Sequence, residues 1–128
     1  GVRNDADTEA RFSQMPAFGV DGLLTAAQIN AIADHVLAIS GQGQDNAEGA
    51  TLFAENCASC HGELGKGEAA LGAPDLTDQI WLYGSDEATI VETITNGRSG
   101  VMPAWEGRLD PATIKAMAVY VHSLGGGK

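Results

Sequence analysis

The chain has 128 residues, of which 44% are hydrophobic and 19% are charged, so it is long enough for one globular domain or slightly more. Seventeen acidic residues against seven basic ones give a net charge of −10, which repels nucleic-acid phosphates and anionic lipid headgroups. No apolar run approaches the roughly 20 residues of a membrane-spanning helix. Because only 5% of the residues are aromatic and seventeen are glycines, we expect something besides side chains to fill part of the interior.

The first predicted helix begins after Thr25 and ends near Ser40. Thr25 and Gln28 have the spacing of a capping box, which satisfies two backbone N–H groups at a helix start. Its apolar residues recur at helical spacing: Ile29, Ile32, Val36 and Ile39. Such a stripe needs cover, so we expect helix 26–39 to pack on the rest of the chain, to self-associate with a second copy, or to fray. Residues 42–46 are predicted to be a linker.

A second helix is predicted over about 47–57, with Asp45 or Asn46 as its N-cap. This helix leads directly into a motif of two cysteines and a histidine. The stretch that follows, residues 62–77, is rich in glycine, alanine and proline. These residues favour turns over regular structure, so we expect a loop there.

Two longer helices are predicted in the last third of the chain. A short helical turn over 81–84 is expected first, followed by a helix that begins at Ser85 as N-cap and stops at Gly97. The last predicted helix covers 111–124 and is capped by Asp110, with a proline in its first position. These elements predict an all-α fold.

Both cysteines of the chain lie in one short motif, Cys57-x-x-Cys60-His61. A redox dithiol of the thioredoxin type would need a βαβ context, but the flanks have helical patterning. A zinc site would need two more ligands, and His35 and His122 lie far away in amphipathic stretches. In covalent haem attachment both thiols add to the haem vinyl groups and the adjacent histidine becomes an axial iron ligand. The adjacent histidine therefore favours haem, with His61 as the first iron ligand.

A second axial ligand is expected from farther along the chain. Low-spin electron-transfer haems commonly have two axial ligands, and a methionine thioether raises the reduction potential. Met102 lies in a glycine-bearing loop that is closed by Pro103, so we predict that Met102 is this ligand. Met117 falls on the apolar face of a helix, where a core position is the simpler interpretation.

An internal repeat relates the two ends of the chain. Its first copy starts with Met15-Pro16-Ala17-Phe18 and its second with Met102-Pro103-Ala104-Trp105. In the helices that follow, the paired positions are Ile29 with Ile114, Ile32 with Met117, Ala33 with Ala118, His35 with Tyr120, Val36 with Val121 and Ile39 with Leu124. Met15 is thus the counterpart of Met102 without a haem motif ahead of it. We expect it to be a loop methionine that packs on its own helix.

Residues 47–127 resemble a class I cytochrome c domain, in which an N-terminal helix leads into Cys-x-x-Cys-His and a C-terminal helix crosses it. The resemblance implies an all-α fold of three to five helices around one covalently bound haem c. It divides the chain into a remnant of a first cytochrome c repeat, residues 1–41, the linker 42–46, and a cytochrome c domain, residues 47–128.

The same resemblance implies particular contacts. Gly49 and Phe53 would meet the C-terminal helix near Tyr120, and the carbonyl of Pro74 would accept a hydrogen bond from Nδ1 of His61. Trp81 or Arg98 could bind a haem propionate, although Arg98 could equally be a solvated loop residue. The residues expected to pack on the haem are Leu71, Leu76, Trp81, Ile94, Val101 and Trp105.

More narrowly, the chain is similar to the dihaem subunit III of cbb3-type cytochrome c oxidases. The similarity rests on residues 15–24, on Ala73-Pro74-Asp75-Leu76-Thr77 and on Ile80-Trp81-Leu82-Tyr83-Gly84. A transmembrane anchor and a first haem domain precede this region in that family, so only the second haem site is carried over. The resemblance implies electron transfer from a donor cytochrome toward the oxygen-reducing catalytic subunit, in the bacterial periplasm, by a domain that is not itself an enzyme.

Two rival functions remain at this stage. The first is a soluble electron carrier or the cytochrome module of a dehydrogenase. It predicts no association with an oxidase core. The second is a haem enzyme or gas sensor with a labile sixth position. It predicts ready binding of carbon monoxide to the ferrous protein.

Overall fold

The computed structural model describes residues 14–100 and 102–125. Predictions that fall on residues 1–13 or on Val101 lie outside these ranges. Five helices and no strands occur in the described part of the chain, as the all-α prediction requires. None of these helices is long and apolar enough to cross a membrane.

The first helix, α1 (Ala26–Ile39), forms as its sequence predicts. The Thr25 hydroxyl accepts a hydrogen bond from the backbone N–H of Gln28, and the Gln28 side chain accepts one from the backbone N–H of Thr25, at 3.3 and 2.9 Å. This is a complete capping box. The helix ends at Ser40, whose backbone N–H donates to the carbonyl of Val36.

The next two helices are joined end to end. The helix α2 (Ala47–Asn56) begins at Asn46, whose side chain accepts a hydrogen bond from the N–H of Gly49. Of the two N-caps considered, Asn46 is thus the one used. Cys57 ends α2 and starts α3 (Ala58–His61), a single turn that carries the rest of the cysteine motif.

The helix α4 (Glu87–Asn96) differs from its prediction at the start. Asp86 is the N-cap and Ser85 is not, because the Asp86 carboxylate accepts hydrogen bonds from both the backbone N–H and the hydroxyl of Thr89. The helical turn predicted over 81–84 is wrong. That stretch is an irregular loop. Asp78 fixes its start, because the Asp78 carboxylate accepts a hydrogen bond from the N–H of Ile80 and the Asp78 carbonyl accepts one from the indole N–H of Trp81.

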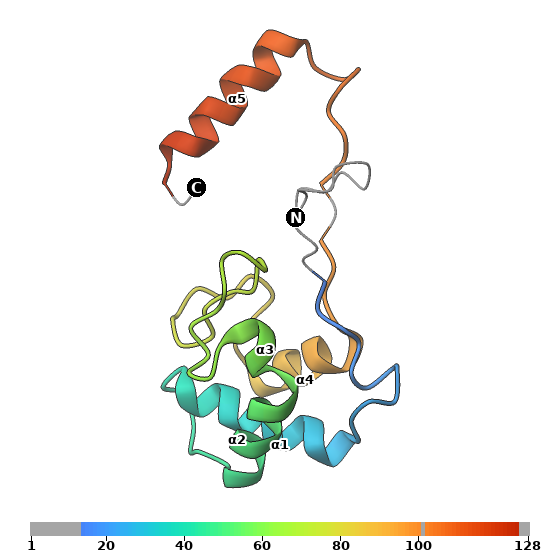
Figure 1. Ribbon diagram of the computed structural model, residues 1–128, viewed down its shortest axis with the longest axis vertical. Coiled ribbons are helices and arrows are strands. Elements are labelled where there is room, and N and C mark those ends of the chain that lie inside the picture. The colour runs from blue at the N-terminus through green and yellow to red at the C-terminus, as the bar shows by residue number, and fades with distance from the viewer. Residues whose placement is uncertain (1–13, 101, 126–128) are drawn as a thin grey trace.

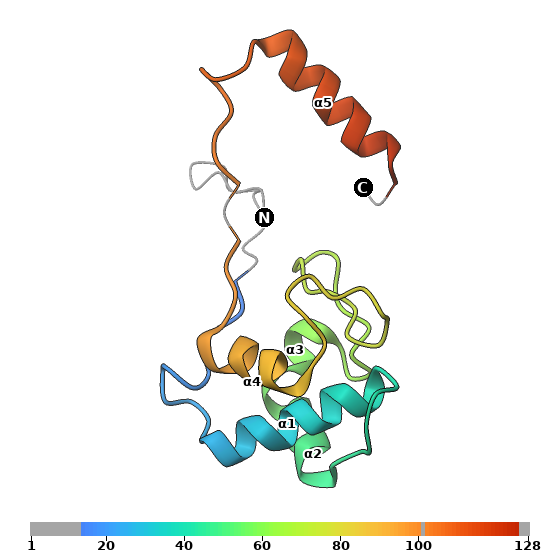
Figure 2. The same cartoon turned by 180° about the vertical axis from the view of Figure 1, so that it is seen from behind.

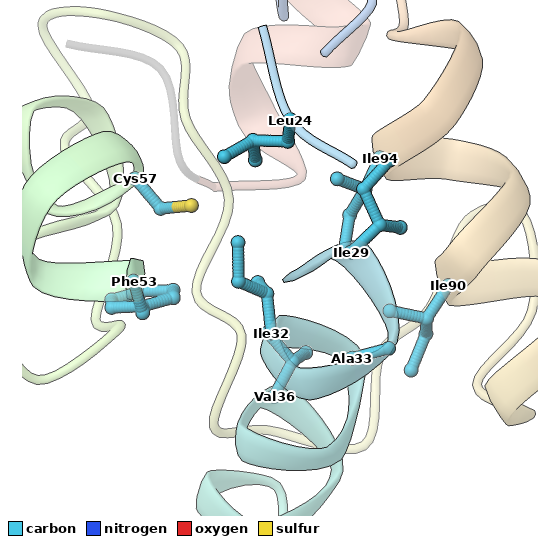
Figure 3. Packing of buried hydrophobic residues seen from close by; sticks show 9 residues of the cluster. All are labelled: Leu24, Ile29, Ile32, Ala33, Val36, Phe53, Cys57, Ile90 and Ile94. Carbon is cyan, nitrogen blue, oxygen red and sulfur yellow. The ribbon is translucent and has the colours of Figure 1, made fainter. Parts of the chain in front are cut away.

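The core lies between α1, α2 and α4 (Figure 1). Side chains of α1 occupy the middle, with those of α2 on one side and those of α4 on the other (Figure 3). The buried cluster consists of Leu24, Ile29, Ile32, Ala33, Val36, Phe53, Cys57, Ile90 and Ile94. The apolar stripe of α1 is therefore covered within the chain, which is the first of the three outcomes expected for it.

The crossing of α1 over α2 is a backbone contact. A Cβ atom added to Gly49 would lie 1.9 Å from the carbonyl oxygen of Ala31 in α1. One turn farther along, the ring of His35 packs on that of Phe53, with 5.2 Å between their centroids. Nδ1 of His35 lies 2.7 Å from the Asp45 carboxylate, which ties the helix to the segment that precedes α2. Two helices approach this closely only where one lacks a side chain.

The helix α5 (Pro111–Ser123) is capped by Asp110 as predicted, but it stands apart from the other four (Figures 1 and 2). It packs on no other helix in the described part of the chain. The expectation that Gly49 and Phe53 meet this helix near Tyr120 is wrong. Tyr120 is 64% exposed, and α1 occupies the crossing, with His35 in the place that the repeat pairs with Tyr120.

Replacement of Gly49 by alanine should lower the free energy of unfolding by about 1–3 kcal/mol or more, because the new methyl group overlaps the Ala31 carbonyl. Denaturant unfolding of the purified protein measures the change. The matched control is Glu55→Ala on the exposed side of the same helix, which should shift stability by less than about 0.5 kcal/mol. Equal stability of the two variants would contradict the close crossing.

Candidate functional site

One helical turn brings the cysteine motif together. The backbone N–H groups of Cys60 and His61 both donate to the carbonyl of Cys57, at 3.1 and 2.9 Å. Both cysteines are free thiols, with Cys57 buried beside the core and Cys60 exposed. Burial, and then the neighbouring Cys60, raise the pKa of Cys57 to about 11. The buried group is therefore a protonated thiol at neutral pH, and a single helical turn carries both cysteines and the histidine.

The imidazole of His61 is oriented by a backbone carbonyl. Its Nδ1 lies 3.1 Å from the oxygen of Pro74, which is the contact that the resemblance implies. A carbonyl oxygen only accepts hydrogen bonds, so Nδ1 carries the proton and Nε2 keeps its lone pair. Burial lowers the pKa of His61, and the bond to Pro74 opposes this only in part. The ring is therefore neutral at neutral pH and offers Nε2 to a metal ion.

Gly67 allows this contact, although the sequence predicted only that it lies in the loop 62–77. Its N–H donates to the carbonyl of His61 at 2.7 Å, and its φ of +77° favours glycine. An added Cβ would lie 2.6 Å from the carbonyl oxygen of Ala73 and 2.7 Å from that of Pro74. The missing side chain therefore lets the backbone of Ala73 and Pro74 lie directly against the loop that follows His61.

The two proposed propionate partners already have protein acceptors. Nε1 of Trp81 donates to the carbonyl of Asp78 at 3.2 Å. Nε and Nη2 of Arg98 donate to the hydroxyl of Thr93 at 3.1 and 2.8 Å, and the guanidinium lies 4.0 Å from the centroid of the Tyr83 ring. Arg98 is thus an ordered side chain and not a solvated loop residue.

The remaining candidates fall into two groups. In the first group, Ile94 is buried in the core cluster, and Leu76 and Trp81 are partly buried and pack against this cluster. Leu71 is 43% exposed. Met102 and Trp105 are 49% and 40% exposed and lie outside the core. These last two residues line an open, mostly apolar hollow of about 700 Å³ with the start of α5. The structure thus brings Cys57, Cys60, His61 and Pro74 together, and leaves Met102 and Trp105 with α5.

Met15, the counterpart of Met102 in the repeat, lies beside the end of α4. Its N–H donates to the carbonyl of Arg98 at 2.9 Å, and its carbonyl accepts the N–H of Arg98. The side chain is partly buried and packs against the cluster that contains Cys57. The internal repeat is the sequence signal that points to Met15, because it pairs this residue with Met102.

The donor set fits a covalently attached haem better than the alternatives. The described residues contain no group of three or more His, Cys, Asp or Glu side chains that could hold a metal ion, as a zinc centre would require. The thioredoxin-type βαβ unit has no counterpart, because the residues on both sides of the motif form helices and loop. Two adjacent thiols and one neutral imidazole with its Nε2 lone pair available match the attachment and axial ligation of haem c.

Comparison with known proteins identifies the family of the chain. The family description "Cytochrome C oxidase, cbb3-type, subunit III" matches residues 44–121. All of the chain aligns with the cbb3-type cytochrome c oxidase subunit FixP of Bradyrhizobium sp. (strain ORS 278), at 64% identity over 45% of that protein. It also aligns in full with subunit CcoP of Cereibacter sphaeroides, at 59% identity over 45% of its length.

The chain spans less than half the length of these curated relatives. The cbb3-type cytochrome c oxidase subunit FixP of Azorhizobium caulinodans also aligns with the whole chain, at 54% identity over 44% of its own length. The matches extend through the cysteine motif, the Pro74 loop and α4. The chain therefore belongs to the family of cbb3-type cytochrome c oxidase subunit III and contains a cytochrome c domain.

Proposed function

We propose that this chain holds one haem c through thioether bonds to Cys57 and Cys60, with Nε2 of His61 as the first axial ligand, and that it transfers electrons. The observation that supports this most directly is the 3.1 Å contact between Nδ1 of His61 and the Pro74 carbonyl, because it leaves Nε2 as the donor atom. When bound, the haem supplies reversible one-electron chemistry between Fe(III) and Fe(II). The chain itself would position the haem and exclude water from it.

The second axial ligand in this proposal is a methionine thioether, supplied by Met102. A soft thioether favours Fe(II) and so raises the reduction potential. Around the haem, Pro74 orients His61, while Trp81, Arg98 and Trp105 are proposed haem contacts. With His61 and Met102 both holding the iron, no position would remain for a substrate, and the chain would be an electron-transfer component and not itself an enzyme.

We place this function in an oxidase complex, because the relatives are named as subunits of cbb3-type cytochrome c oxidases. In this proposal electrons arrive from a donor cytochrome on the periplasmic side and leave toward the oxygen-reducing catalytic subunit. The net charge of −10 favours partners with basic docking surfaces and speeds their encounter at low salt.

The first test of haem attachment is the intact mass of the protein made in a host that matures c-type cytochromes. We expect the polypeptide to carry the mass of one haem after denaturation. The double variant Cys57→Ser/Cys60→Ser should lose this mass completely, because a hydroxyl does not form the thioether bond. The control variant Ser59→Ala, between the two cysteines, should keep it. A wild-type chain without added mass would refute the proposal.

The nature of the second ligand is tested by spectroscopy of the wild-type protein. A thioether ligand predicts the red charge-transfer absorption of sulfur-ligated ferric haem. It also predicts slow, incomplete binding of carbon monoxide to the ferrous form at neutral pH. Prompt binding of carbon monoxide, together with no such absorption, would instead favour an enzyme or gas sensor with a labile sixth position.

The role of the Pro74 contact is tested by Gly67→Ala. The added methyl group would collide with the Pro74 carbonyl and weaken its bond to Nδ1 of His61. A less basic imidazole stabilises Fe(III) less, so the reduction potential should rise. Gly62→Ala is the matched control, because Gly62 also has a positive φ but nothing lies within 4 Å of its added Cβ. Equal shifts in both variants would contradict this role for Pro74.

A further inference from the structure

The segment that carries Met102 leaves α4 at Gly97, directly before Arg98 (Figure 1). Gly97 ends the helix with a φ of +66°, a conformation that favours glycine. The chain advances by four residues from Arg98 to Met102, which span at most about 14 Å when fully extended. The place where Arg98 is held therefore limits where the backbone of Met102 can lie.

The side chain of Arg98 folds back onto α4. Its Nε and Nη2 donate to the hydroxyl of Thr93 at 3.1 and 2.8 Å. The Arg98 side chain is 27% exposed, so these two hydrogen bonds from a charged donor are largely shielded from water. Glu92 lies 3.9 Å from Nη2, but its side chain is 62% exposed and such a surface pair contributes little. The bonds to Thr93 are thus the main attachment of this side chain to the helix.

The ring of Tyr83 covers the guanidinium of Arg98. Cζ of Arg98 lies 4.0 Å from the centroid of this ring, a stacking contact to which a planar guanidinium is well suited. Tyr83 lies two residues beyond Trp81 in the same loop. The three residues Arg98, Thr93 and Tyr83, here called the Arg98 clamp, therefore join α4, the loop of Trp81 and the start of the Met102 segment.

We propose that Arg98 is a positioning residue for the second axial ligand, because the Arg98 clamp fixes the start of the Met102 segment and so sets how firmly the thioether holds the iron. This inference rests on the proposed function, since it concerns the haem ligated by His61 and Met102. A tethered ligand competes with free ligands in proportion to its effective concentration at the iron. Release of the clamp spreads the thioether over a larger volume and lowers that concentration.

This role depends on the shape of the guanidinium and not on its charge. Arginine presents its N–H donors in a fixed plane that also stacks on an aromatic ring, whereas lysine has a compact ammonium group. Arg98→Lys should therefore weaken the clamp nearly as much as Arg98→Gln, although it keeps the positive charge. A residue that acted through its charge on a haem propionate would instead tolerate lysine.

Titration of the ferric protein with imidazole measures how firmly the thioether is held. Imidazole displaces methionine from the iron, and loss of the charge-transfer absorption reports the displacement. Arg98→Gln should lower the imidazole concentration for half displacement by about tenfold, as expected for the loss of hydrogen bonds from a charged donor. The ferrous variant should also bind carbon monoxide faster, and its reduction potential should fall because the thioether favours Fe(II).

Two further sets of variants separate the clamp from general effects of charge. Thr93→Val removes the accepting hydroxyl at nearly constant shape and should reproduce Arg98→Gln, whereas Thr93→Ser keeps the hydroxyl and should resemble the wild type. Arg108→Gln is the matched charge control, because Arg108 is exposed on the other side of Met102, with Cζ 5.7 Å from the centroid of the Trp105 ring. It should change the imidazole concentration by less than about twofold.

Three results would overturn the inference: a wild-type titration for Arg98→Lys, no change in Thr93→Val, or equal changes in Arg98→Gln and Arg108→Gln. These results leave the proposed function intact if Met102→Leu abolishes the absorption of the wild type. An absorption that survives Met102→Leu, or a wild-type chain without haem, would refute the proposed function and the Arg98 clamp with it. Far-ultraviolet circular dichroism identifies any variant that fails to fold. If Arg98→Gln fails, the comparison of Thr93→Val with Thr93→Ser decides.

Discussion

The contact between Gly49 and the Ala31 carbonyl sets the arrangement of this chain, because it lets the backbones of α1 and α2 touch. Once they touch, Phe53 is enclosed by His35 and the α1 stripe, and Cys57 at the end of α2 is buried at the edge of the same cluster. α4 closes the other side through Ile90 and Ile94. The position of the cysteine motif therefore follows from a helix crossing, and the crossing depends on one missing side chain.

A second constraint acts through hydrogen bonds. The loop after His61 returns so that the Pro74 carbonyl meets Nδ1, and Gly67 is the residue that allows the two backbone segments to lie together. The tautomer of the imidazole is thereby decided by the fold before any metal ion is bound. The low pKa of His61, which arises from burial, keeps the ring neutral and suited to ligation.

Local signals in the sequence predicted local structure well. The caps at Thr25 and Asp110 and the stop at Gly97 appear as expected, because each depends on neighbouring backbone groups. The predicted N-cap Ser85 is wrong by one residue, because the Asp86 carboxylate accepts hydrogen bonds from both the N–H and the hydroxyl of Thr89. The choice of α1 over α5 at the crossing was not predictable from the apolar pattern, because the two repeat helices carry the same apolar spacing.

The most direct measurement of the central claim is the set of nuclear Overhauser contacts made by the Phe53 ring in the diamagnetic ferrous protein. The account predicts contacts from Phe53 to the imidazole of His35, as the 5.2 Å separation of the ring centroids requires. Contacts from Phe53 to Tyr120, with none to His35, would show that α5 covers α2 and would contradict the account.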